Sequence, residues 1–343
     1  MVIVVPASQH SDESWKSGGG NYFFELLQSA KERYGEHAVD IFIVDENSPN
    51  SVWQASLAQF LVSTAATHCV AFVESDPGHS GRWNWGNFAA LARRSWDGAF
   101  VGILTDGLYL LHQARATRFR HAFPRSSFVA IDIDQSRYAG FLPDRTIFGP
   151  CFLPISDSSV TALSRANSDV GNQREFDIVF VGKVYPNREG FLDELKSSGL
   201  RIGVNPHRQD PATRPGYPEY ITALGRGHFT VNLSEAGGFP APQLKSRVLE
   251  GPLFGTIICS DESALAQRFF GAGDFVYFDS VEGLKAAVIP LLKDASRLET
   301  MRATAKVRAR AIASDAFWST VERGLLENGL TLPMRDSAAR PSA

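Results

Sequence analysis

Short runs of apolar, often β-branched residues alternate along the chain with longer stretches in which apolar residues recur every three or four positions. The short runs predict buried strands and the longer stretches predict amphipathic helices. In the first half, strands are expected at 2–5, 40–44, 68–73, 100–104 and 128–133. The helices expected between them lie at 21–34, 51–66, 83–95 and 108–123. This alternation predicts a parallel sheet with helices on both faces.

The alternation resumes after a change in composition. Residues 141–155 are apolar and punctuated by proline, and residues 156–174 are polar and rich in Ser and Asn, which is typical of a domain boundary. Beyond it, strands are expected at 176–182, 200–204, 228–233 and 256–259, and a turn and a further strand are expected within 265–280. Helices are expected at 189–198, 219–224, 281–294, 296–312 and 315–328. The pattern therefore predicts a second α/β domain.

Length and composition agree with two domains and exclude some partners. A chain of 343 residues exceeds what one hydrophobic core usually serves, and 44% hydrophobic residues suffice for two cores. With 34 Lys and Arg against 37 Asp and Glu, the net charge of −3 is too balanced for the broad basic surface of a nucleic-acid-binding protein. No nucleic acid is therefore expected as a partner.

Three cysteines lie far apart in apolar runs, at Cys69, Cys151 and Cys259, and are expected to be buried thiols. No basic region precedes the first apolar run, and no stretch approaches the ~20 apolar residues of a membrane span. We expect a cytoplasmic protein, with association at a membrane surface left open.

Carboxylates follow several predicted strands of the first domain. Ligands of parallel sheets bind beyond the carboxyl ends of the strands, so an acidic side chain there can act as the general base for a hydroxyl. The candidates for this base are Asp12, Glu74 and Asp106. The alternative is that such residues cap the following helices. The Trp-rich turn at 79–85 is either a platform on which a sugar stacks or a cluster that packs a loop onto its domain.

Gly18, Gly19 and Gly20 stand directly before the first predicted helix. Glycines at a helix N-terminus let backbone N–H groups approach a ligand, and the helix dipole favours a negative group there. The spacing is not that of a dinucleotide fingerprint. A plain linker is the alternative.

A short helix expected after Leu244 carries Lys245, Arg247 and Glu250 and leads into the buried strand at 256–259. Arg and Lys neutralise phosphate oxygens, and a carboxylate can accept both hydroxyl protons of a ribose. The group therefore suits a nucleoside diphosphate. A solvated helix face with one i,i+3 ion pair is the alternative.

The pattern Lys-x-Arg-x-x-Glu, followed by Gly255 and by TIICSDESALAQRFFGAGDFVYFDSVEGL, resembles the donor-binding half of GT-B glycosyltransferases, and most of all their group 1, CgeB-like branch. The strand that ends in Phe-Val-Gly182, with its short loop and Arg188, matches the same branch. The resemblance extends over about residues 175–330. One departure is Pro242, which stands where retaining group 1 enzymes carry a second Glu.

The resemblance implies two Rossmann-like domains that face each other across a cleft. The implied donor-binding residues are Gly182, Lys183, Arg188, Glu235, Gly237, Lys245, Arg247 and Glu250. By the same resemblance, Gly18 to Gly20 belong to a loop on the side of the cleft that binds the acceptor. The expected parts are a first domain at 1–156, a linker at 157–174, a nucleotide-sugar-binding domain at 175–313, a helix at 314–330 that returns to the first domain, and a disordered tail at 331–343.

The implied activity is transfer of a sugar from a nucleotide-sugar donor to a hydroxyl of a saccharide or small-molecule acceptor. We expect neither a metal nor a cofactor, because the Asp-x-Asp spelling at Asp132 and Asp134 lies in the first domain, away from the expected donor site. Two other classes stay open. One is an epimerase-like enzyme acting on a nucleotide sugar, and the other is a non-catalytic carbohydrate-binding protein.

Overall fold

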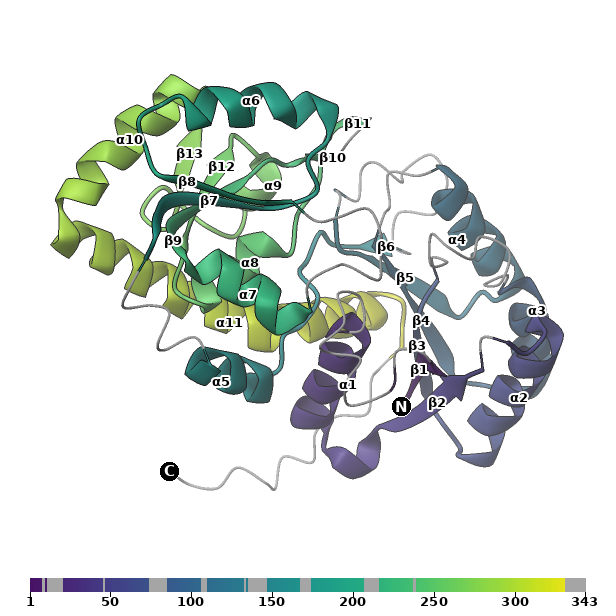
Figure 1. The fold of residues 1–343 in the computed structure, drawn as a ribbon. Coiled ribbons are helices and arrows are strands. Elements are labelled where there is room, and N and C mark those ends of the chain that lie inside the picture. The colour runs from purple at the N-terminus through teal and green to yellow at the C-terminus, as the bar shows by residue number, and fades with distance from the viewer. Residues whose placement is uncertain are drawn as a thin grey trace, which may run out of the picture. The chain divides into compact units, whose positions relative to one another are not determined.

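The computed structural model describes residues 1–7, 10, 21–45, 47–73, 85–105, 110–132, 134, 147–166, 174–206, 216–236 and 239–330. They form two compact units (Figure 1). Unit 1 contains the described residues of 1–14, 22–154 and 317–330, and unit 2 contains residue 21 and the described residues of 155–316.

Unit 1 is built on a parallel six-stranded sheet in the order β2-β1-β3-β4-β5-β6. Its strands are β1 Val2–Pro6, β2 Asp40–Val44, β3 His68–Phe72, β4 Ala99–Leu104, β5 Ser126–Ala130 and β6 Ile147–Phe148. Its helices are α1 Asn21–Tyr34, α2 Asn50–Ser63, α3 Gly86–Ser95 and α4 Leu110–Ala122, with a 3₁₀ turn η3 at Glu36–Ala38.

Hydrophobic cores cover both faces of this sheet, as the sequence predicts. Successive strand residues point to opposite faces, so Val2 and Val4 of β1 join the core under α2, α3 and α4, whereas Ile3 and Val5 join the core under α1. Trp85 lies buried in the first of these cores, 5.2 Å from Trp53 between ring centroids. Packing is therefore the role of this tryptophan.

Unit 2 has a parallel five-stranded sheet in the order β13-β12-β9-β7-β8. Its strands are β7 Phe176–Gly182, β8 Ile202–Pro206, β9 Gly227–Asn232, β12 Ile257–Asp261 and β13 Val276–Phe278. Its helices are α5 Asp157–Ala166, α6 Pro186–Lys196, α7 Tyr217–Gly225, α8 Arg247–Leu253, α9 Ala264–Gln267 and α10 Val281–Lys293.

Parts of unit 2 were not expected. Helix α5 lies in the stretch interpreted as a linker; Asp157 stands in its first turn, and Val160 and Leu163, three residues apart, are buried. Strands β10 Glu235–Ala236 and β11 Phe239–Pro242 form an antiparallel hairpin in a stretch for which no strand was predicted. Within the described residues these two strands pair only with each other, which tolerates the prolines of β11.

The last helix also differs from expectation. Helix α11, Ala295–Glu327, is continuous, whereas two separate helices were expected. Ala305, Ala309, Ala313 and Phe317 are buried at intervals of four residues, so one apolar stripe runs through the expected break. Residues 295–316 belong to unit 2, and the residues from Phe317 onward belong to unit 1.

The three cysteines are buried and unpaired, as expected. In the part of the chain that the structure describes, no helix is both long enough and apolar enough to cross a bilayer.

Candidate functional site

The strand order of unit 2 creates a topological switch point at the carboxyl ends of β7 and β9. The chain leaves β7 for β8 on one side and then returns to form β9 on the other side of β7. Connections that diverge in this way leave room beyond the strand ends, where parallel sheets bind their ligands. Gly182 and Asn232 are the last residues of these two strands.

Arg247 lies over this point. It is the first residue of α8, and its Nη1 donates to the carbonyl oxygen of Val231 in β9 at 3.5 Å. Its guanidinium carbon lies 5.4 Å from the centroid of the Phe180 ring in β7, which is within cation–π range. The arginine is thus held across both strands of the switch point.

Gly182 makes this placement of Arg247 possible. A Cβ added at Gly182 would lie 2.5 Å from Nη2 of Arg247, and the φ of Gly182 is +153°, a value that other residues rarely adopt. The absent side chain therefore lets the guanidinium lie directly over the end of β7.

Arg188 lies nearby on the first turn of α6 and is only 5% exposed. Among the ion pairs of the described residues, none includes Arg188 or Arg247. Burial, and then the charge of Arg247, lower the pKa of Arg188 to about 10. The Arg188 guanidinium is still charged at neutral pH, so Arg188 and Arg247 together present positive charge at this end of the sheet, which an anion would neutralise.

Three further sequence-predicted residues lie around the same strand ends. Lys183 follows β7, is exposed, and places its Nζ 4.8 Å from the centroid of the Tyr185 ring. Lys245 precedes α8, and its Nζ donates to Oε1 of Gln243. Glu235 begins β10 with an exposed side chain, and its backbone oxygen accepts from Arg188.

Glu250 faces inward instead. It is 3% exposed, and Oε2 of its carboxyl group accepts a hydrogen bond from Oη of Tyr220 on α7 at 2.8 Å. Burial raises the pKa of Glu250, while the hydrogen bond from Tyr220 opposes this rise. The helix is therefore not the solvated face considered as an alternative, and binding of a ribose by Glu250 stays a prediction.

Polar residues missed by the sequence reasoning also lie at this end of the sheet. Asp261 ends β12, and its Oδ2 accepts from both the backbone N and Oγ of Ser234, each at 2.8 Å. Nδ2 of buried Asn232 donates to Oγ of Ser260 at 3.0 Å. The signal that could have found Asp261 is the one used in the first half, a carboxylate at the end of a buried strand.

Several predicted residues lie outside the described residues. They are the base candidates Asp12, Glu74 and Asp106, the glycines Gly18, Gly19 and Gly20, and Gly237 of the donor set. Asp45, another strand-end carboxylate of unit 1, is described, and it accepts from the backbone N of Asn47 and from Oγ of Ser48, both at 2.9 Å. Asp45 therefore stabilises a turn.

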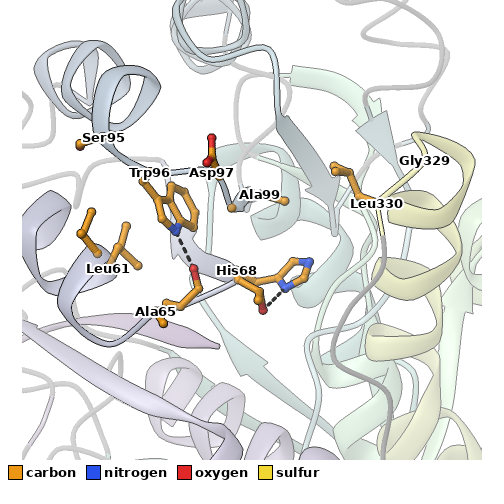
Figure 2. Close-up of a pocket in the computed structure, with 13 residues that line it drawn as sticks. Leu61, Ala65, His68, Ser95, Trp96, Asp97, Ala99, Gly329 and Leu330 are labelled. Carbon is orange, nitrogen blue, oxygen red and sulfur yellow. Dashed lines mark hydrogen bonds between the residues drawn. The ribbon is translucent and has the colours of Figure 1, made fainter.

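A pocket of about 500 Å³ lies in unit 1 at the opposite, amino-terminal edge of its sheet, beside the first residues of β3 and β4 (Figure 2). Its walls include His68, Trp96 and Leu330. Trp96 Nε1 donates to the carbonyl oxygen of Ala66 at 2.6 Å, and Nδ1 of His68 lies 2.9 Å from Oγ1 of Thr67 (Figure 2). These contacts lie beside the first residues of β3 and β4. None of the residues singled out from the sequence lines the pocket.

No family model and no curated protein matches the chain. Solved structures with the GT-B glycosyltransferase fold, two Rossmann-like α/β domains, do align with almost all of it. HepE of Anabaena, solved with UDP-glucose, is 14% identical, with a TM-score of 0.54 over 95% of this chain and 100% of HepE. An α-glucosyltransferase solved with UDP-glucose and DNA containing an abasic site is 9% identical, with a TM-score of 0.60 over 95% and 98% of the two chains.

Sucrose-phosphate synthase from Thermosynechococcus elongatus is a third similar structure, at 12% identity and a TM-score of 0.52 over 96% of this chain and all of that one. At such identities the likeness shows the fold, and it confirms the predicted α/β, GT-B class. The group 1, CgeB-like branch is not confirmed and stays a prediction.

Proposed function

We propose that this protein is a glycosyltransferase that moves a sugar from a nucleotide-sugar donor to an acceptor hydroxyl. The observation that carries the proposal is the guanidinium of Arg247, which lies without an ion-pair partner among the described residues at the switch point of the unit 2 sheet, against Gly182. Charge and position both suit the diphosphate of a nucleotide sugar.

In the reaction, the bond between the anomeric carbon of the sugar and the diphosphate oxygen breaks, and the electron pair leaves with the diphosphate. The acceptor oxygen bonds to the same carbon, and its proton passes to a base. Arg247, Lys245 and Lys183 would stabilise the charge that develops on the leaving group. The proposed base is Asp12, Glu74 or Asp106, each a carboxylate of the first domain.

The comparisons support a nucleotide-sugar donor, because HepE and the α-glucosyltransferase were both solved with UDP-glucose. HepE was also solved with UDP and glucose, at a TM-score of 0.50 to this chain, which supports a saccharide as acceptor. We further propose that cationic side chains, rather than a divalent metal, neutralise the diphosphate in this chain.

Calorimetric titration with UDP, GDP and dTDP, with and without a chelator, tests the proposal. We expect one of them to bind in both conditions. Arg247→Ala should weaken that binding by well over tenfold, because loss of a buried charge contact costs about 2–5 kcal/mol. The matched control is Arg201→Ala, which removes an exposed arginine paired with Asp177 in the same unit and should leave affinity unchanged.

Product analysis separates the proposed activity from the alternatives. A transferase releases a nucleoside diphosphate in proportion to glycosylated acceptor, whereas an epimerase-like enzyme converts the donor into an isomer without an acceptor. Binding of the donor without turnover would favour the remaining alternative, a non-catalytic carbohydrate-binding protein. Equal affinity in Arg247→Ala and wild type would refute the assignment of the donor site.

A further inference from the structure

We propose that Arg188 and Asp261 form a clamp on the turn Leu233–Glu235, and that Arg188 supports the site through this clamp rather than by contact with the ligand. The sequence alone indicated a direct donor contact for Arg188. The ligand in question is a nucleoside diphosphate, and on this point the inference rests on the proposed function.

Arg188 ties together two segments that are far apart in the sequence. Its Nη1 donates to the carbonyl oxygen of Lys183, after β7, at 3.0 Å. Its Nη2 donates to the carbonyl oxygens of Leu233, at 3.3 Å, and Glu235, which lie 45 and 47 residues further along the chain. The planar guanidinium thus joins the β7–α6 connection to the β9–β10 turn.

Asp261 holds the same turn through the residue between those two carbonyls. Its Oδ2 accepts from the backbone N and from Oγ of Ser234, both at 2.8 Å, and Oγ of Ser260 donates to Oδ1 at 3.3 Å. The backbone oxygen of Ser234 accepts from the backbone N of Gln243 at 3.0 Å. Arg188 on α6 therefore binds the first and third residues of the tripeptide Leu233–Glu235, and Asp261 on β12 binds the second.

The clamp is connected to Lys245 and Arg247 through the β10–β11 hairpin and Gln243. The clamped turn leads into the β10–β11 hairpin, and the hairpin is followed by Gln243, which bonds to Ser234 through its backbone and receives a hydrogen bond from Lys245 through its side chain. Helix α8, which begins with Arg247, follows directly. A displaced turn would therefore displace the segment that carries Lys245 and Arg247.

The burial of Arg188 argues against direct binding of a phosphate. Only 5% of the residue is exposed, and its Nε is buried without a hydrogen-bond partner. Its Nη atoms are committed to backbone oxygens, and the Tyr185 ring lies 4.9 Å from the guanidinium carbon. A Lys ammonium cannot reproduce a fork that reaches carbonyls of two segments.

Hydrogen–deuterium exchange on the full chain tests the clamp without a ligand. We expect Arg188→Lys and Asp261→Asn each to speed exchange of the amides in 230–243 by about tenfold or more, the scale of a lost hydrogen bond to a charged group. Exchange in α10 should stay the same. Arg201→Lys, the same substitution at an exposed arginine of unit 2, is the matched control and should change neither region.

Affinity for UDP separates positioning from charge. Asp261→Asn removes a negative charge near the proposed diphosphate site, so electrostatics alone would tighten UDP binding. The clamp predicts the opposite, a loss of about tenfold or more in both Arg188→Lys and Asp261→Asn. Tighter binding in Asp261→Asn would overturn the proposal.

Unchanged exchange in 230–243 in both variants would also overturn it, and together with lost affinity in Arg188→Lys it would make Arg188 a direct ligand. If Arg188→Lys does not fold, the isosteric Asp261→Asn gives the same two measurements. A wild-type chain that binds no nucleoside diphosphate would contradict the proposed function alone, because the exchange experiment still decides whether the clamp exists.

Discussion

At the scale of single residues, the candidate site depends on Gly182, a residue without a side chain. Gly182 leaves the end of β7 uncovered, and Arg247 occupies the space that a Cβ would take. The sequence marks this glycine as the end of a buried strand. That it serves to admit an arginine becomes visible only when β7 and α8 are placed together.

Gly182→Ala should therefore displace Arg247 while the chain still folds. The new Cβ would meet the far end of a flexible side chain, and the φ of +153° adds backbone strain of about 1–3 kcal/mol. We expect affinity for the bound nucleoside diphosphate to fall about tenfold or more, measured by calorimetric titration, with a modestly lower melting temperature.

The control is Gly190→Ala on α6, where a Cβ would meet nothing within 4 Å. It should leave affinity unchanged and stabilise the fold by about 0.4–1 kcal/mol, because alanine restricts the unfolded chain. Wild-type affinity in Gly182→Ala would show that the position of Arg247 does not matter for binding.

His68 gives a prediction about pH. Burial, and then the nearby charge of the amino terminus, lower its pKa from 6.5 to about 4. The unfolded chain therefore takes up a proton on His68 near pH 6.5, whereas the folded chain does so only near pH 4. The stability that comes from neutral His68 is present above pH 6.5 and is lost as the pH falls towards 4.

The size of this effect is at most about 3 kcal/mol. It is measured as the free energy of unfolding of wild type and His68→Gln at several pH values between 7.5 and 4.5. The variant should lose less stability than wild type over this range. Parallel losses in the two proteins would contradict the prediction.

At the scale of elements, the end of α11 is part of the unit 1 core. Trp318 is fully buried, and its Nε1 donates to Oγ of Ser29 on α1 at 3.1 Å. Glu322 accepts from Nε and Nη2 of Arg33 at 2.9 and 2.7 Å and from Oη of Tyr34 at 2.8 Å. The helix is thus held on α1 by both apolar and charged contacts.

Trp318→Ala should destabilise the protein by about 3–5 kcal/mol, because it leaves a large cavity in a packed core. Leu326→Ala, in the same helix but at a residue that is 65% exposed, is the control and should change stability by less than about 0.5 kcal/mol. Denaturant titration of both variants measures the difference. A small loss in Trp318→Ala would mean that the end of α11 packs loosely.

At the scale of the whole molecule, the unit 1 core under α1 is completed by the last described segment. Phe317, Trp318, Val321 and Leu325 share one cluster with Ile3 and other residues of unit 1. Residues more than 300 positions apart therefore meet in one core, and unit 1 cannot be completed before residues 317–325 are available.

A chain that ends at residue 316 should consequently fail to fold unit 1, whereas a chain that ends at residue 330 keeps every described core residue. Limited proteolysis with mass mapping tests this. We expect the shorter chain to be cut within residues 22–154, with residues 155–316 more resistant. Equal protection of residues 22–154 in both chains would show that this segment folds without the end of α11.

The sequence was most informative where a residue's environment follows from its neighbours in the chain. Helix α1 and strands β2 and β7 have the predicted bounds, because apolar periodicity reports local conformation and burial directly. The expected break near residue 314 was wrong. No Gly or Pro stops the helix there, and the buried apolar stripe continues through this position.

For the site, the sequence by itself determined which residue types stand at the strand ends: a glycine that ends β7, and the cations Lys183, Arg188, Lys245 and Arg247 around it. Only the tertiary structure decided what each one meets. Arg188 and Arg247 both lie beside strand ends. Arg188 donates to backbone carbonyls of two separate segments, whereas Arg247 lies over the switch point with one contact to the Val231 carbonyl. Glu250 turns inward to Tyr220, 30 residues away. Periodicity encodes burial along one element, but hydrogen-bond partners come from segments that only the completed fold brings within reach.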